Sequence, residues 1–168
     1  MENIFVRRSI RKYKNIQIEK EKIEKLLHAA MQAPSAGNQQ PWEFLILENK
    51  ETLGKLSKIS PYATMLKEAP LAIIVLSNTE KMRFPEYWQQ DLGAATQNIL
   101  LEAVELGLGS VWLGVAPLKE REDFIKEMFN LPNEVTPFNI IVLGYPSEGQ
   151  ENKFVDRYDE ARVHFEEY

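Results

Sequence analysis

Hydrophobic and polar residues repeat along the chain with two periods, and each period predicts a kind of secondary structure. Helical spacing begins at Ile18 and continues to Met31, with Glu and Lys on the solvent face, and Ala33-Pro34 ends this helix. Continuous or alternating apolar runs between turn formers predict strands. The expected strands are residues 42–47, 71–76, 110–115 and 138–145, and the other expected helices are residues 51–59, 87–106 and 121–129.

Two of these segments are more apolar than a surface element needs to be. Residues 71–76 read Leu-Ala-Ile-Ile-Val-Leu, which is typical of a central strand buried on both faces. Residues 87–106 are apolar around much of the helix and include Ala94 and Ala103, whose small side chains allow a close neighbour. Because the connections are too irregular for a doubly wound fold, we expect an α+β domain, or a mixed sheet flanked by helices, over residues 1–168.

The overall composition excludes several classes of protein. The chain has 168 residues, of which 44% are hydrophobic and 27% charged, as in an ordinary globular domain. The absence of Cys excludes disulfides, iron–sulfur clusters and a cysteine nucleophile, and two His are too few for a His-rich metal centre. A net charge of −5 argues against nucleic-acid binding. Without a secretory signal or an apolar run of ~20 residues, we expect a cytoplasmic protein outside the membrane.

The C-terminal tail, residues 147–168, begins polar and then carries several large apolar side chains. They include Phe154, Tyr158 and Phe165. A purely solvated tail rarely holds so many aromatic residues, so we expect this tail to dock on a body, either its own or a partner's.

The first candidate site is the run Arg7-Arg8-Ser9-Ile10-Arg11-Lys12-Tyr13-Lys14, which contains five basic residues and no acid. Guanidinium groups bind phosphate in bidentate fashion, and a neighbouring Ser hydroxyl adds a donor. Two other interpretations are a solvated basic face and a basic arm for nucleic acid. A salt-dependent mobility-shift assay separates the last of these from a phosphate pocket.

A second candidate is the loop Pro34-Ser35-Ala36-Gly37-Asn38-Gln39-Gln40-Pro41-Trp42. Its small residues leave the backbone accessible, and its three consecutive amides both donate to and accept from a planar heterocycle. An ordinary helix-to-strand connection is the alternative.

A third candidate is residues 107–117, where glycines flank a short apolar strand and let a ligand approach the backbone near Gly114. Taken in isolation, this segment is better explained as a turn followed by a core strand. In the tail, Lys153 and Arg157 would share a face if the segment were helical, although surface ion pairing is the default explanation. Neither His28 nor His164 has the neighbours of a catalytic triad.

Together these motifs resemble the nitroreductase family of flavin enzymes. The resemblance runs from end to end of the chain. It rests on residues 7–11, residues 34–42, Gln97-Asn98-Ile99-Leu100-Leu101 followed by Gly107-Leu108-Gly109, and Arg157. It implies an α+β fold and an obligate homodimer with FMN at the subunit interface.

The resemblance also implies a role for individual residues. Arg7 and Ser9 would hold the FMN phosphate, with Arg8 nearby and with Arg157 and Lys153 completing the phosphate site, and Arg11 would lie at the N1/O2 edge of the flavin. The partner subunit would contribute Pro34, Ser35, Ala36, Asn38 and Gln40. The isoalloxazine would be lined by Trp112, Leu113, Gly114 and Val115, with a backbone N–H directed to N5.

One position departs from the family pattern. Where some larger members have a neutral amide, this chain has Asp91. Because a carboxylate beside reduced flavin is unfavourable, either Gln89 or Gln90 takes that place or Asp91 points away.

The function implied is that of an FMN-dependent NAD(P)H oxidoreductase that works by ping-pong hydride transfer. NAD(P)H and then a nitroaromatic, quinone or enone would stack on the flavin, with Trp88 or Phe84 as wall residues. The lack of a recognisable acid–base pair or nucleophile agrees with chemistry carried by a cofactor. The alternatives are a flavin-fragmenting or dehalogenating enzyme of the same fold, and a non-catalytic FMN-binding protein.

Overall fold

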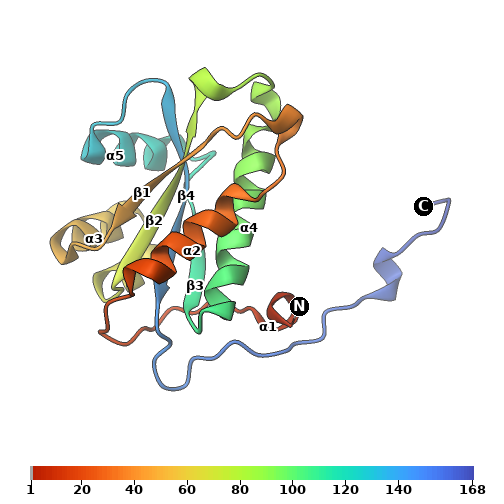
Figure 1. Cartoon of the computed structure of the whole chain (residues 1–168), viewed down its shortest axis with the longest axis horizontal. Helices are drawn as coiled ribbons and strands as arrows, with labels where there is room; N and C mark the ends of the chain where they lie inside the picture. The colour runs from red at the N-terminus through yellow and green to blue at the C-terminus, as the bar shows by residue number, and fades with distance from the viewer. Residues whose placement is uncertain (1) are drawn as a thin grey trace.

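Four strands form one sheet in the order β1-β2-β4-β3 in the computed structural model, which describes residues 2–168 (Figure 1). They are β1 (Trp42–Leu47), β2 (Leu71–Asn78), β3 (Gly109–Gly114) and β4 (Val135–Gly144). Each neighbouring pair of strands is antiparallel. All four predicted strands are present, and each begins and ends within three residues of its expected bounds.

The central strand β2 separates two hydrophobic cores because its side chains point alternately to the two faces of the sheet. Ile73 and Val75 belong to one core, and Ala72 and Ile74 belong to the other. All four side chains are fully buried. The prediction that this strand is buried on both faces is therefore confirmed.

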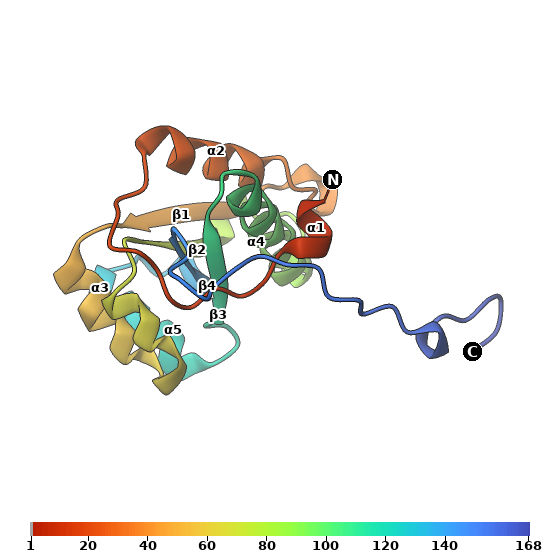
Figure 2. The same cartoon turned by 90° about the horizontal axis from the view of Figure 1, so that it is seen from below.

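Helices cover both faces of the sheet, as Figure 2 shows from below. On one face lie α2 (Lys20–Met31) and α4 (Trp88–Glu105). On the other lie α3 (Lys50–Leu56), α5 (Lys119–Phe129) and two 3₁₀ turns at Ser57–Ile59 and Pro61–Lys67. A short helix, α1 (Asn3–Val6), precedes the basic segment. The α+β fold class is confirmed.

A bulge in β4 shapes the end of β3. The register between β2 and β4 shifts at this point, so that Val75 pairs with Asn139 and Leu76 with Pro137, leaving Phe138 unpaired. The Phe138 carbonyl instead accepts hydrogen bonds from the backbone N–H groups of Val115 and Ala116 at 3.2 and 3.0 Å. The strand begins before its expected start at residue 138 because this bulge accommodates Pro137, which has no N–H to donate.

The segment after α1 runs along the edge of β3 and then crosses the end of the sheet. Ser9 forms a parallel bridge with Ser110, and the Ile10 N–H donates to the Ser110 carbonyl at 2.9 Å. Farther along, the Lys14 N–H donates to the Tyr145 carbonyl at 2.8 Å. These bonds fix the basic run against the sheet.

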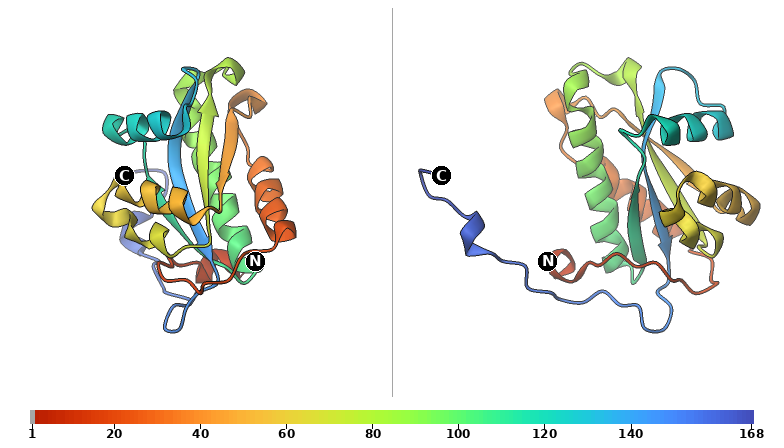
Figure 3. Two further views of the ribbon diagram at one scale, coloured as in Figure 1. Left: turned by 90° about the vertical axis from the view of Figure 1, so that its left-hand side faces the viewer. Right: turned by 180° about the vertical axis from the view of Figure 1, so that it is seen from behind.

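The C-terminal tail extends away from the sheet and its helices, as Figure 1 and the right-hand view in Figure 3 show. Phe154, Tyr158 and Phe165 are 62%, 75% and 85% exposed. Residues 147–152 contact the basic segment, for example through the Arg8 N–H that donates to Asn152 Oδ1. Residues 154–158 face α1 across a cavity, and residues 159–168 extend away from the body. Residues 159–168 do not dock on the chain's own body, because the tail points outward and buries none of these side chains. Of the two alternatives raised by the sequence, docking on a partner stays a prediction.

Residues 2–168 contain neither a membrane-spanning helix nor a cluster of metal-binding side chains. In that range no helix has both the length and the apolar composition needed to cross a bilayer. Over the same residues, His, Asp and Glu side chains do not gather in groups of three that could hold a metal ion.

Candidate active site

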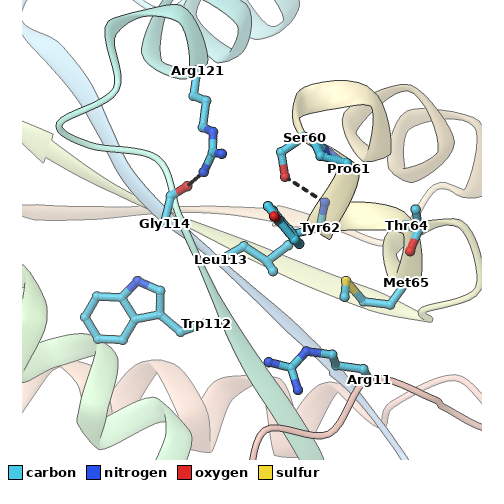
Figure 4. Close-up of a pocket in the computed structure, with 10 residues that line it drawn as sticks. All are labelled: Arg11, Ser60, Pro61, Tyr62, Thr64, Met65, Trp112, Leu113, Gly114 and Arg121. Carbon is cyan, nitrogen blue, oxygen red and sulfur yellow. Dashed lines mark hydrogen bonds between the residues drawn. The ribbon is translucent and has the colours of Figure 1, made fainter.

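A cavity of about 490 Å³ lies where β3 ends (Figure 4). Its walls come from β3, from the 3₁₀ turn that precedes β2, from α5 and from the basic segment. The residues that line it are Arg11, Ser60, Pro61, Tyr62, Thr64, Met65, Trp112, Leu113, Gly114 and Arg121. Arg11 and Arg121 reach it from opposite sides, as Figure 4 shows, and within residues 2–168 it has no carboxylate in its wall. The cavity is therefore an electropositive site with apolar and aromatic walls.

Trp112 forms one wall of this cavity and is held from behind by aromatic contacts. Its ring packs edge-on against Phe138, with centroids 5.6 Å apart, and Trp88 packs on Phe138 in the same way at 5.7 Å. The bulge in β4 thus presents Phe138 between two tryptophans. Trp112 remains 37% exposed, so an aromatic surface is available at the cavity.

The peptide after Gly114 is fixed on both sides. The Arg121 guanidinium donates to the Gly114 carbonyl through Nη1 at 2.7 Å, while the Val115 N–H donates to the Phe138 carbonyl. Val115 itself is fully buried and does not line the cavity. Sequence reasoning missed Arg121; the available signal was an arginine between two glutamates in the first turn of α5.

The basic segment from Arg7 to Arg11 is extended, so alternate residues face opposite ways. Ile10 is buried under the sheet edge, whereas Ser9 and Arg11 are exposed. Over these five residues an extended chain spans about 13 Å. Arg11 therefore reaches the cavity at β3, while Arg7 lies near the opposite end of the same segment.

Around Arg7 a second cavity, of about 360 Å³, brings together basic residues from both ends of the chain. It is lined by Arg7 and Arg8 and by tail residues that include Asp156 and Arg157. Burial lowers the pKa of Arg7, and the charges of Arg8 and Arg157 lower it further. No ion pair within residues 2–168 involves any of these three guanidinium groups. An anion bound here would relieve their mutual repulsion.

Arg8 holds the backbone of this region together. Its guanidinium donates to the carbonyls of Arg7 and Phe5, and its own N–H donates to Asn152 Oδ1 at 3.0 Å. Its Nε is buried without a partner in the described chain. Arg8 therefore links α1 to the start of the tail.

Lys153 lies apart from Arg157. It lines a third cavity, of about 210 Å³, with Arg8 and Ser9, and it pairs with Glu151 at 3.6 Å. The tail is not helical between residues 151 and 159, so the shared helical face considered for Lys153 and Arg157 does not form.

The loop of residues 34–40 lines none of these three cavities. Gly37, Asn38 and Gln40 all have left-handed backbones, with φ of 53°, 55° and 49°. The Gln40 N–H donates to Ser35 Oγ at 3.0 Å. Pro34, Asn38 and Gln40 are exposed, and Ser35 and Ala36 are partly exposed. The loop is thus a shaped surface of the chain, separate from the cavity at β3.

Asp91 is directed at this loop and away from the cavity at β3. It is only 4% exposed and accepts from the Ala36 N–H at 2.9 Å and from Gln39 Nε2 at 2.6 Å. Neither Gln89 nor Gln90 lines the cavities described above, and both are exposed. Of the alternatives raised by the sequence, the structure supports the one in which Asp91 points elsewhere.

Known proteins are similar to this chain over its whole length. The family model described as "Nitroreductase family" matches residues 4–64 and 59–145. A protein of Methanothermobacter thermautotrophicus, provisionally named an NADH dehydrogenase/NAD(P)H nitroreductase, is 45% identical over all of this chain and 87% of its own length. An iodotyrosine deiodinase of Haliscomenobacter hydrossis is 25% identical over 94% of this chain and 83% of its own length.

Solved structures share the fold closely. A crystal structure from Clostridium acetobutylicum, provisionally named an NADH oxidase, is 60% identical, with a TM-score of 0.97 and 99% of each chain covered. An FMN-dependent nitroreductase from Clostridium difficile R20291 is 36% identical, with a TM-score of 0.90 and all of both chains covered. With a family model matched over most of its length and a relative 45% identical across the whole of it, this chain belongs to the nitroreductase family.

Proposed function

We propose that the chain is an FMN-dependent NAD(P)H oxidoreductase that reduces a small acceptor such as a nitroaromatic, a quinone or an enone. One observation carries the proposal. A single extended segment joins an aromatic, electropositive cavity at Arg11 to a cluster of mutually repelling guanidinium groups at Arg7. A planar ring with a phosphate at the end of its side chain matches these two features.

The donor set suits this cofactor. Arg7 and Arg157 would hold the phosphate with Ser9, and Arg8 and Lys153 would lie beside it. Arg11 would face the N1/O2 edge, where a positive charge stabilises the anion of the reduced ring. When bound, FMN supplies hydride transfer through N5, taking the hydride from NAD(P)H and delivering it to the acceptor in a ping-pong sequence.

The chain's own backbone would orient the ring. Leu113 and Gly114 would lie along the isoalloxazine with Trp112, and a backbone N–H of this strand would point toward N5. That donor would precede Val115, because the N–H groups of Val115 and Ala116 donate to the Phe138 carbonyl. Arg121 and Phe138 keep the strand end in place through the carbonyl of Gly114 and the N–H of Val115. Val115 would act through this framework because its side chain is buried.

We further propose a homodimer in which FMN lies at the interface. The loop of residues 34–40 would reach the partner's flavin with Pro34, Ser35, Ala36, Asn38 and Gln40. The exposed aromatic residues of the tail have no surface of their own chain to cover, which supports docking on the partner. Gly93 and Ala94 of α4 are partly exposed, and their small size would allow close approach of a second copy.

Dehalogenation is the second candidate, supported by the deiodinase relative. That alignment spans 191 positions, more than the whole of this chain, so the deiodinase carries inserted residues that are absent here. A binding segment built from such an insertion would be lacking. We therefore favour the reductase over both dehalogenation and flavin fragmentation, and the experiment below distinguishes it from flavin binding without catalysis.

An anaerobic absorbance spectrum of the purified protein, taken before and after NADH and then NADPH, tests the proposal. We expect flavin bands that bleach when the reduced nucleotide is added. Bands that persist would indicate a non-catalytic flavoprotein or a different electron donor. A colourless protein that cannot be reconstituted with FMN would overturn the proposed function.

A further inference from the structure

We propose that Asp91 sets the orientation of the Gln39 side-chain amide and so locks the loop of residues 34–40 to the segment that carries Phe84. Asp91 and Gln39 are then positioning residues for the flavin and acceptor surfaces. This inference rests on the proposed function for its effect on catalysis, although the hydrogen-bond arrangement stands without it.

The carboxylate of Asp91 is tied to the loop through both oxygens. Oδ1 accepts from the Ala36 N–H at 2.9 Å, and Oδ2 accepts from Gln39 Nε2 at 2.6 Å. An ionised carboxylate has no proton to donate. The group that Gln39 presents to it must therefore be the NH₂ end of the amide.

This orientation places the Gln39 oxygen where two backbone donors meet. Oε1 accepts from the N–H groups of Arg83 and Phe84 at 2.9 and 2.8 Å, and Nε2 also donates to the Phe84 carbonyl at 3.1 Å. If the amide turned over, its NH₂ would face two N–H donors and its oxygen would face a carboxylate. The carboxylate of Asp91 and the two backbone donors thus favour the same one of two amide orientations.

The selected orientation fixes Phe84 against the loop. A Cβ at Gly37 would lie 2.4 Å from Phe84 Cε2, so the ring occupies the space that a side chain would take. The loop also holds two non-glycine residues with left-handed backbones, Asn38 and Gln40, a conformation that persists only where surrounding contacts enforce it. The bonds to Asp91 and Gln39 supply those contacts.

The loop and Phe84 both belong to the proposed flavin and acceptor sites. In the proposed dimer the loop faces the partner's flavin, and Phe84 is a candidate wall of the acceptor site. If the Gln39 amide were free to rotate, neither the loop nor Phe84 would be held in place. It would leave the phosphate contacts of Arg7 and Arg157 intact, so FMN binding would weaken without being abolished.

The test compares four variants of the holoenzyme, and one of them is a control. Asp91→Asn removes the charge that orients the amide, and we expect FMN release after dilution, followed by flavin fluorescence, to be roughly tenfold faster. The KM for the acceptor should rise more than kcat falls. Gln39→Glu alone would place a second carboxylate against that of Asp91, and this variant should release FMN at least as fast as Asp91→Asn. Gln32→Glu, an exposed neutral-to-acid change at the end of α2, is the matched control and should behave as wild type.

The double variant Asp91→Asn/Gln39→Glu gives the sharpest expectation. The new amide at position 91 would accept from the Ala36 N–H and donate to the new carboxylate at position 39. That carboxylate would in turn accept from the N–H groups of Arg83 and Phe84. Every bond of the network except that to the Phe84 carbonyl is restored. We expect FMN release within about threefold of wild type, a recovery that a general loss of stability would not produce.

Amide hydrogen exchange at Arg83 and Phe84 tests the orientation without flavin. Protection should fall in Asp91→Asn and return in the double variant. Unchanged protection and unchanged FMN release in Asp91→Asn would overturn the inference, as would failure of the double variant to recover either. A wild-type protein that holds no FMN would overturn the proposed function, while the exchange measurement would still decide the role of Asp91.

Discussion

Ile10 lies so close to Gly109 that a Cβ at position 109 would be 2.6 Å from the Ile10 Cγ2 atom. Gly109 pairs across the sheet with Gly144, and a Cβ at Gly144 would lie 2.8 Å from the ring of Tyr13. The basic segment therefore rests on a pair of glycines in adjacent strands. The distance between this segment and the sheet depends on the absence of a side chain at both positions. The position of Arg11 at the cavity depends on it in turn.

Gly109→Ala should displace Ile10 and the segment around it. Because the clash is with a buried β-branched side chain, we expect the free energy of unfolding to fall by about 1–3 kcal/mol. FMN content should fall with it, since the proposed phosphate and ring contacts lie on this segment. Urea unfolding and the ratio of flavin to protein absorbance measure the two effects.

Gly54→Ala is the matched control for this substitution. Gly54 lies within α3, and a Cβ there would meet nothing within 4 Å. Alanine in a helix is favoured over glycine by roughly 0.5–1 kcal/mol, so this variant should be more stable with unchanged flavin content. Equal destabilisation by both variants would show that the contact at Ile10 is not the cause.

Arg7→Ala should release FMN while the chain still folds. One charge-assisted phosphate contact is worth roughly 1.5–3 kcal/mol, which corresponds to a rise of at least about tenfold in the dissociation constant. The apoprotein should be no less stable than wild type, because the substitution removes repulsion with Arg8 and Arg157. Fluorescence titration with FMN measures the affinity, and Arg162→Ala in the exposed tail is the control.

Arg121→Ala should leave the Gly114 carbonyl without its 2.7 Å partner. We expect FMN to be retained, because the phosphate contacts are elsewhere, and reduction by NAD(P)H to be slower by about tenfold. Stopped-flow absorbance under anaerobic conditions measures that step. An unchanged rate would mean that the Phe138 contact to Val115 is enough to hold the end of β3.

The sequence predicts those parts of the fold that depend on local pattern. Residues 71–76 could be assigned to a central strand because a short, continuous apolar run that contains Ile73, Ile74 and Val75 is typical of a strand buried on both faces. The start of β4 could not, since Pro137 is compatible with a strand only where a bulge removes the need for its missing N–H. That bulge is a property of two strands far apart in the chain.

In the candidate site, too, features that depend on local sequence could be predicted, and features that depend on contacts between elements could not. The basic run could be connected to phosphate because the chemistry of guanidinium groups is independent of fold. The roles of Asp91 and Arg121 depend on distances across the chain, from α4 to a loop 55 residues earlier and from α5 to the end of β3. Neither residue lies in a motif. The direction of the tail could not be predicted either. Its aromatic side chains indicate that it docks on a protein surface, but they do not indicate whether that surface belongs to the same chain or to a partner.

Tyr13 gives a prediction about pH. Its hydroxyl is buried and donates to the Ile10 carbonyl, and burial raises the pKa of Tyr13 well above its ordinary value of 10.0, against the opposing charge of Arg11. The folded state therefore keeps a proton that the unfolded chain loses. Stability from this group is full below pH 10 and declines as the pH rises above it.

Tyr13→Phe separates this titration from other alkaline effects. The variant lacks the hydrogen bond, so it should be less stable than wild type at pH 8 by about 0.5–1.5 kcal/mol. It also lacks the titrating hydroxyl, so the difference from wild type should shrink as unfolding is measured between about pH 9 and pH 11. A constant difference over that range would show that the Tyr13 hydroxyl titrates equally in both states, and that its burial beneath the basic segment does not hold in solution.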